Sequence, residues 1–386
     1  MQNITQPSDK TVSTIAFATI ALLAAFCTWM VFFYDASGKR FLFSIKEEVP
    51  VYGSILTAIS LIVYSVTRNK FQYATRIYVI ALAILLFVTG AATMVASGIA
   101  NNLYFVHRHD TYHYLLGPKY YPELQYNRHY GCSAAADSES EKPTLKPSDY
   151  IRNLVTYKYQ PVGYDLARWQ KDCPNYFGVR WEEFKHDIEV YKKLGDLKYW
   201  MGDMGYNGTP FHAYVMGKIA NIAPLTFENI RRFTVIDMLL ICSMITAVIW
   251  STGGHIGMLA GIYFFVYAGD QFRITGNAYG RYMWMSLLII GLCLLIKKRF
   301  TLAGLCVAFS MMTALFPCLF FAGLGVTGLR EWVQKKRFPD NYELIAFGAV
   351  VGIIIAFYLA TNFADGYKNL IFYYEKISDR TRLSII

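Results

Sequence analysis

Long apolar segments constrain the fold of this chain more than any other feature. Runs long enough, or nearly so, to cross roughly 30 Å of hydrocarbon lie at 13–34, 50–67, 77–97, 233–252, 282–296 and 342–361, and a shorter one lies at 255–269. Apolar residues make up 55% of the chain and charged residues 17%, against about 25% charged in soluble domains. The sequence predicts an all-α polytopic membrane protein with about eight spans. It excludes a soluble enzyme domain, a disordered chain and a small disulfide-rich scaffold.

The apolar run 302–329 is interrupted by Pro317 and has two interpretations. One long helix would be tilted in the bilayer, whereas two half-length helices would form a re-entrant hairpin. The connections 68–76, 297–299 and 330–337 are the basic ones. Because basic connections favour the cytoplasmic side, and all three share that side only if 302–329 returns, we predict the hairpin.

This topology predicts the domain organisation. Two extra spans occupy 1–76, a further span occupies 77–97, and the remaining spans lie within 232–361. Residues 98–231 form a large exported loop domain, and 362–386 form an exported tail. The loop from Gly98 to Ile230 holds 15 basic and 15 acidic residues, so the net charge of +10 belongs to the spans and their connections. Such charge suits anionic headgroups rather than nucleic acid.

Two segments of the exported loop predict amphipathic helices lying on the membrane surface. Ser148 and Asp149 suit the start of a helix over 147–157, and a spacing of three to four apolar residues predicts a second helix over 180–194. The loop also contains Cys132 and Cys173. An oxidising compartment would allow these two residues to form a disulfide, and two free thiols remain the alternative.

The densest polar cluster follows the run 77–97, between His107 and Tyr114. His109 and His113 are four residues apart, so on a helix they share one face and can ligate a metal. The sequence offers no evident third ligand, so no cofactor is required and a hydrogen-bonded interfacial cluster is favoured; a divalent metal ion is the alternative. Asp110 is flanked by donors that can orient it, as a general base requires.

Four segments carry a resemblance to a known superfamily. They are HDTYHYLLGPKYYPELQY (109–126), WMGDMGYNGTPFH (200–212), GDQFRITGNAYGRYMW (269–284) and KKRFTLAGLCVAFSMMTALFP (297–317). Together, over roughly 77–375, the chain resembles bacterial members of the C-type glycosyltransferase superfamily (GT-C). The resemblance implies that a sugar moves from a polyprenyl-phosphate donor to an acceptor at the outer face of a bacterial cytoplasmic membrane. It also implies that Asp110 is the catalytic base.

The same resemblance suggests roles for other polar residues. Guanidinium groups suit the charge of a departing lipid phosphate, which makes Arg281, Arg273 and Arg108 candidates for that contact. Anchoring in the lipid headgroups is the alternative for these arginines. The candidates for an acceptor or sugar pocket are His109, His113, Tyr112, Asp203 and Asn207. A turn with hydrogen bonds from its own Asp and Asn side chains is the alternative for the last two residues.

Asp237 lies inside the run 233–252, where an acid is costly and usually paired or functional. Arg231, Arg232 or Arg281 could pair with it structurally, and coordination of a substrate or lipid phosphate is the alternative.

Departures from the superfamily pattern support a second hypothesis. Two spans precede the presumed first helix of the conserved module, fewer spans follow than in many relatives, and 25 residues follow the last one. A shortened member, or one that keeps the scaffold without the activity, would show these features. The chain would then be a non-catalytic accessory or structural subunit with other membrane subunits as partners. A transporter is disfavoured because there are no duplicated halves and few intramembrane charges.

Overall fold

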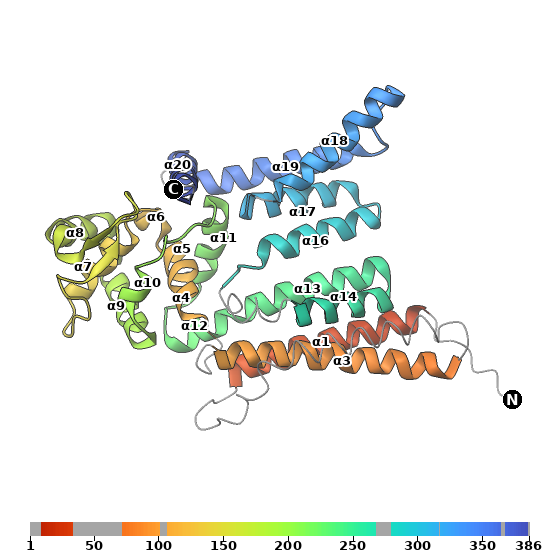
Figure 1. Ribbon diagram of the computed structural model, residues 1–386, viewed down its shortest axis with the longest axis horizontal. Coiled ribbons are helices and arrows are strands. Elements are labelled where there is room, and N and C mark those ends of the chain that lie inside the picture. Colours follow the sequence, from red (N-terminus) through yellow and green to blue (C-terminus); the bar gives the residue numbers. More distant parts are fainter. Residues whose placement is uncertain are drawn as a thin grey trace. The chain divides into compact units, whose positions relative to one another are not determined.

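The computed structural model describes residues 9–33, 72–100, 106–267, 279–315, 317–363 and 367–384. These residues are mostly helical, with one small two-stranded sheet (Figure 1). The expected span 50–67 and the candidate Arg273 lie outside the described residues.

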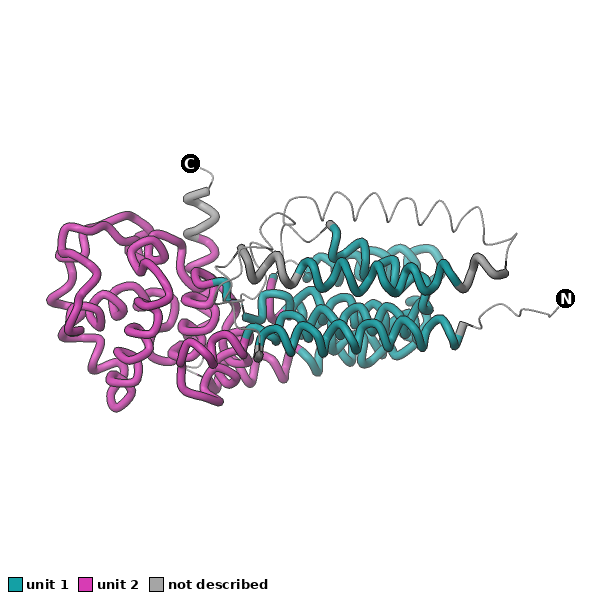
Figure 2. The backbone as a smooth tube through the Cα atoms, turned by 90° about the horizontal axis from the view of Figure 1, so that it is seen from below, with its two compact units in different colours: residues 1–107, 234–311, 315–352 teal, residues 108–233, 312–314, 353–386 magenta. Residues whose placement is uncertain are grey.

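The chain divides into two compact units (Figure 2). Unit 1 comprises residues 1–107, 234–311 and 315–352, and unit 2 comprises residues 108–233, 312–314 and 353–386. Unit 1 contains most of the apolar helices, and unit 2 contains most of the large polar loop.

Unit 1 is a bundle of apolar helices. They are α1 (Asp9–Phe33), α3 (Gln72–Ala100), α13 (Val235–Thr252), α14 (Gly254–Tyr267), α16 (Met283–Ile296), α17 (Phe300–Thr313), α18 (Cys318–Lys335) and the first half of α19 (Tyr342–Thr361). The core between α1, α3, α13 and α14 includes Leu23, Leu86, Ile245 and Phe265. At Gly254 a Cβ atom would lie 2.7 Å from the Val12 backbone, so the small residue allows α14 and α1 to approach closely.

Three described helices are long and apolar enough to cross a membrane: Lys10–Val31, Phe227–Thr252 and Tyr342–Thr361. Shorter apolar helices cover Ile77–Thr93, Gly254–Val266, Met283–Ile296 and Phe300–Thr313. These helices are compatible with a membrane protein, as the apolar runs predict.

The run 302–329 forms two helices, α17 and α18, which are separated around Pro317. Proline cannot donate to a helical ladder and restricts the residue before it, which accounts for a break at this point. The α17 helix also contacts α19 closely, because a Cβ atom at Gly304 would overlap the carbonyl oxygen of Ile345.

Asp237 is fully buried in α13 and has a structural role. Its two carboxylate oxygens accept the backbone N–H groups of Tyr279 and Gly280, each at 2.9 Å. Tyr279 and Gly280 have φ angles of 68° and 75°, a left-handed turn that glycine adopts without steric cost. Pairing with backbone amides thus connects α13 to the turn that precedes α16. Pairing of Asp237 with Arg231, Arg232 or Arg281 stays a prediction.

Unit 2 is built from short helices and one hairpin. In order they are α4 (Arg108–Thr111), the π-helix η2 (Tyr112–Leu116), α5 (Gly117–Lys119), α6 (Tyr121–Leu124), α7 (His129–Ser138), β1 (Tyr150–Arg152), β2 (Tyr159–Pro161), α8 (Val162–Phe177), η3 (Gly178–Arg180), α9 (Trp181–Leu194), α10 (Leu197–Trp200), α11 (Pro210–Ala220), α12 (Phe227–Phe233) and α20 (Lys368–Ser384). A disulfide between Cys132 and Cys173 joins α7 to α8, with their Cα atoms 5.5 Å apart. The pairing that the sequence left open is therefore present.

The helix predicted over 147–157 is wrong, because this segment forms β1 and the turn after it. The strands pair antiparallel, with Ile151 opposite Gln160. The side-chain oxygen of Asn153 accepts the backbone N–H groups of Val155 and Thr156, and such local bonds compete with a helix. Asp149 accepts from the Lys198 ammonium group instead of capping a helix.

The helix predicted over 180–194 is confirmed as α9, although its apolar face does not lie on a membrane surface. The residues that carry the periodicity are all buried within unit 2: Trp181, Phe184, Ile188, Tyr191 and Leu194. The Phe184 ring packs edge-on against Tyr120 and also contacts Phe177. This face builds the core of the unit, because burial against protein removes the same apolar area from water as lipid would.

Candidate functional site

The candidate site begins on the helical segment 108–119, which comprises α4, η2 and α5. Its central turn is a π-helix, a rare element that is frequent at functional sites. His109, Asp110 and His113 lie on this segment, and their side chains form the centre of the site with Asp203. We call these four residues the His–Asp cluster.

Helix α9 holds the segment 108–119 in place through backbone carbonyl groups. The Arg108 guanidinium donates to the Leu194 carbonyl at 2.6 Å, and the Tyr191 hydroxyl donates to the Thr111 carbonyl at 2.9 Å. Arg108 was a candidate for binding a donor phosphate, and this bond gives it a structural role as well.

A buried ion pair anchors the other end of the segment. Lys119 Nζ lies 2.6 Å from Asp187 Oδ2, and both side chains are 1% exposed. The Tyr120 hydroxyl donates to the same oxygen at 2.7 Å, and Lys119 also reaches Glu183 at 2.8 Å. A buried charge pair needs such additional hydrogen bonds to offset its loss of hydration. Sequence reasoning missed this pair, because its partners are 68 residues apart.

Asp203 comes from the bend that follows α10 and completes the cluster. Two bonds position the loop after this bend: the Lys376 ammonium donates to the Met204 carbonyl at 2.9 Å, and the Tyr126 hydroxyl donates to the Gly208 carbonyl at 2.8 Å. Lys376 is itself buried, with its Nζ atom 5.6 Å from the centre of the Tyr126 ring. The loop is therefore supported by α20 and by the segment after α6.

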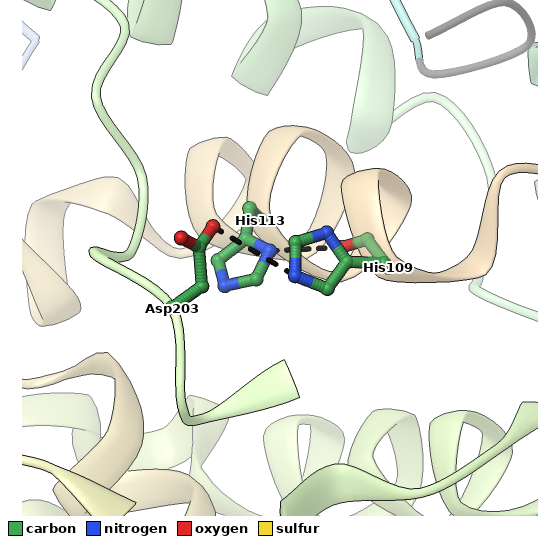
Figure 3. Close-up of side chains that lie close together, drawn as sticks. All are labelled: His109, His113 and Asp203. Carbon is green, nitrogen blue, oxygen red and sulfur yellow. Dashed lines mark hydrogen bonds and ion pairs between the residues drawn. The ribbon is translucent and has the colours of Figure 1, made fainter. Parts of the chain in front are cut away.

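The four side chains of the His–Asp cluster lie in contact. Figure 3 shows the two imidazole rings side by side, with the Asp203 carboxylate facing them. The ring centres of His109 and His113 are 4.7 Å apart. His109 Nδ1 lies 3.2 Å from Asp110 Oδ1, and His109 Nε2 lies 3.7 Å from Asp203 Oδ2. The Asp110 side chain is only 9% exposed, whereas those of His109 and Asp203 are 27% and 46% exposed.

Hydrogen bonding defines the tautomer of His113. Its Nδ1 atom is 2.8 Å from the His109 carbonyl oxygen, which only accepts, so Nδ1 carries the proton. Its Nε2 atom therefore has the lone pair and accepts from the Tyr130 hydroxyl at 2.7 Å. Burial lowers the pKa of the His113 imidazole below its usual range, and His109 acts in the same direction. His113 is neutral near pH 7 as a result.

One ring nitrogen from each histidine and one oxygen of Asp203 lie within 4.8 Å of one another. These three groups are the described residues that could hold a metal ion together. The sequence offered no evident third ligand, and the structure places one there, because Asp203 approaches the histidines from 90 residues further along the chain. Its Gly-rich surroundings mark a turn in the sequence, but no spacing rule relates that turn to His109.

Other predicted site residues are placed differently. Tyr112 is fully buried, donates to Ser133 at 2.8 Å and stacks on His129, so its ring is not a platform for a sugar in this structure. The side-chain oxygen of Asn207 accepts the Tyr114 hydroxyl. Arg281 belongs to unit 1, in the turn that precedes α16.

Comparisons with models of protein families, with curated proteins and with solved structures find no match to this chain. The GT-C likeness therefore rests on the sequence motifs alone.

Proposed function

We propose that this chain is a membrane glycosyltransferase that moves a sugar from a polyprenyl-phosphate donor to an acceptor at the outer face of a bacterial cytoplasmic membrane. The observation that carries the proposal is the setting of Asp110. This carboxylate lies in the first turn of unit 2, and His109 Nδ1 contacts it at 3.2 Å. A carboxylate held in one orientation beside a donor is what a general base requires.

In the proposed reaction the acceptor hydroxyl attacks the anomeric carbon of the donor sugar. A new carbon–oxygen bond forms as the bond between that carbon and the phosphate oxygen breaks, and polyprenyl phosphate leaves with the electron pair. The acceptor proton passes to Asp110, and the configuration of the sugar is inverted. His109 is a positioning residue, because it orients the carboxylate without taking the proton.

The exposed fractions of the cluster side chains indicate the side from which an acceptor could reach Asp110. The Asp110 side chain is 9% exposed, and the more open side chains of the cluster are those of His109 and Asp203. We propose that the acceptor approaches along these two residues. The proposed phosphate ligands are Arg281, Arg273 and Arg108, as the resemblance implies.

The membrane topology that we propose has about eight spans and places residues 98–231 on the exported side. The three helices long enough to span support it, and so do the four shorter apolar helices. The basic connections 297–299 and 330–337 favour the cytoplasmic side.

The test is transfer by the full chain in proteoliposomes. Polyprenyl-phosphate glucose and mannose serve as donors, and release of polyprenyl phosphate in the presence of a saccharide acceptor is measured. We expect Asp110→Asn to lower turnover by about 10²-fold or more, since a general base contributes about 10²–10⁴-fold. Glu182→Gln makes the same change at an 80% exposed site on α9 and should retain wild-type turnover. Full turnover in Asp110→Asn would eliminate the proposed base.

A second function, that of a non-catalytic subunit, is favoured by the burial of the cluster. Asp110, Tyr112 and His113 are all buried, and Arg108 is bonded to α9. Under this alternative Asp110 stabilises unit 2 instead of reacting. The wild-type chain would then release no polyprenyl phosphate from either donor, and Asp110→Asn would speed hydrogen exchange of the segment 108–119.

A further inference from the structure

We propose that the His–Asp cluster binds one divalent transition-metal ion, through one ring nitrogen each of His109 and His113 and a carboxylate oxygen of Asp203. These ligand atoms lie within 4.8 Å of one another. Two imidazoles and one carboxylate suit zinc and iron(II), and three protein ligands leave a coordination position for water or a substrate. The inference goes beyond the proposed transfer reaction and does not depend on it.

The hydrogen bonds around both rings are those of metal-binding histidines. Such histidines donate their second ring N–H to a carboxylate or a backbone carbonyl, which orients the ring and selects the tautomer. His109 Nδ1 faces Asp110 Oδ1 at 3.2 Å, and His113 Nδ1 donates to the His109 carbonyl at 2.8 Å. Nδ1 is therefore the oriented atom in both rings, and we assign Nε2 of each ring as the atom that would bind the ion. An ion on His109 Nε2 leaves the contact with Asp110 intact.

Ion binding requires the three ligand atoms to move closer together. A metal–nitrogen distance of about 2.0–2.1 Å places neighbouring ligand atoms of a tetrahedral site roughly 3.3 Å apart. Asp203 is the ligand that can move, since it is 46% exposed and lies in a bend flanked by Gly202 and Gly205. His109 Nε2 and Asp203 Oδ2 are already 3.7 Å apart, so the distances from His113 to these two atoms are the ones that must shorten most.

The Tyr130 hydroxyl must yield His113 Nε2 to the ion. Its oxygen also lies 3.2 Å from the Trp200 carbonyl, so the proton it now directs to Nε2 has a second acceptor. Turning this hydroxyl toward Trp200 keeps its hydrogen bond and exposes the lone pair of the imidazole, which limits the cost of the exchange.

Charge and access also suit a dication. Asp203 as a ligand and Asp110 behind His109 place two carboxylates at the site, and together they balance the charge of a divalent ion. His109 and Asp203 are the partly exposed members of the cluster, so a hydrated ion can reach the site without the unit unfolding.

The test measures metal binding, not transfer. The full chain, purified in detergent with a tag that contains no histidine and stripped with a chelator, is titrated with Zn²⁺ by calorimetry and with Co²⁺ by visible absorption. We expect one ion per chain. Asp203→Asn and His109→Gln should each weaken binding by about tenfold or more, and Asp110→Asn by about 10- to 100-fold. His186→Gln removes an exposed imidazole beside another aspartate and should change nothing.

Two results would overturn the site. One is the absence of saturable binding of either ion to the wild-type chain, and the other is equal affinity in Asp203→Asn, His109→Gln and wild type. Both substitutions are at partly exposed side chains, and unchanged hydrogen exchange in α9 would show that the variants fold. A chain that binds zinc but transfers no sugar refutes only the proposed function, whereas transfer without ion binding refutes only the metal site.

Discussion

Replacing Lys119 with methionine should destabilise the part of unit 2 that holds the His–Asp cluster. Lys119 Nζ lies 2.6 Å from Asp187 Oδ2, and both side chains are 1% exposed. Methionine keeps most of the volume of the lysine stem and removes only the charge and its hydrogen bonds. Asp187 then keeps the Tyr120 hydroxyl at 2.7 Å and an exposed His186 whose Nδ1 atom is 3.5 Å away.

The expected cost follows from the burial of the remaining charge. Removing one partner of a buried ion pair lowers the free energy of unfolding by about 3–5 kcal/mol, because the other charge remains buried without a compensating partner. Glu183 also reaches Lys119, at 2.8 Å, but its side chain is 43% exposed. Water replaces an exposed partner, so Glu183→Gln should cost less than about 1 kcal/mol. The double variant Lys119→Met/Asp187→Leu removes both buried charges and should recover most of the loss.

Hydrogen exchange of the α9 amides measures this cost in the full chain. Local opening governs exchange in the folded protein, and 1.4 kcal/mol corresponds to about a tenfold change in rate. Lys119→Met should therefore speed exchange across Trp181–Leu194 by roughly 10²- to 10⁴-fold. The apolar helices of unit 1 serve as an internal control. A change of less than about tenfold, or a double variant at least as unstable as the single one, would refute the account of a buried, mutually dependent pair.

Other predictions concern a disulfide, an acid buried in an apolar helix and a buried imidazole. Reducing the Cys132–Cys173 bond, or replacing both residues with alanine, should lower the unfolding free energy of unit 2 by about 2–5 kcal/mol, and hydrogen exchange of α7 and α8 with and without reductant measures the loss. Asp237→Ala removes two charge-assisted hydrogen bonds to backbone amides; it should cost about 3–6 kcal/mol and lower the thermal midpoint in detergent, with a smaller effect for Asp237→Asn. Burial lowers the pKa of His129 well below its usual range, and no described residue hydrogen-bonds its ring nitrogens. The unfolded state then takes up the proton first as pH falls below about 6.5, so His129 should lower the stability of unit 2 by up to about 1.4 kcal/mol per pH unit, and His113, whose pKa is also lowered, adds to this slope. His129→Phe should make the dependence less steep, and an equally steep profile in the variant would contradict the assignment.

Local patterns in the sequence predicted the parts of the fold that depend on neighbouring residues. The spacing of apolar residues in α9 identified its buried face, and the four-residue interval placed His109 and His113 on one side of a helix. The pattern did not identify what covers the face of α9, because the hydrophobic effect is non-directional. Local residue types were misleading in the segment 147–157. Asp and Asn favour both helix starts and turns, so Asp149 and Asn153 did not distinguish a helix from a strand followed by a turn.

Membrane-compatible helices and the candidate residues of the cluster are therefore what the sequence alone determined, since hydrophobicity and helical period are local properties. Tertiary structure decided the partners: Asp203 beside the histidines, Asp187 beside Lys119, and backbone amides around Asp237. Each of these contacts joins residues more than 40 positions apart. Periodicity in the sequence does not predict such a contact, because the chain entropy lost in bringing two distant residues together hardly depends on which residues they are. Only the packing of the surrounding helices selects these pairs.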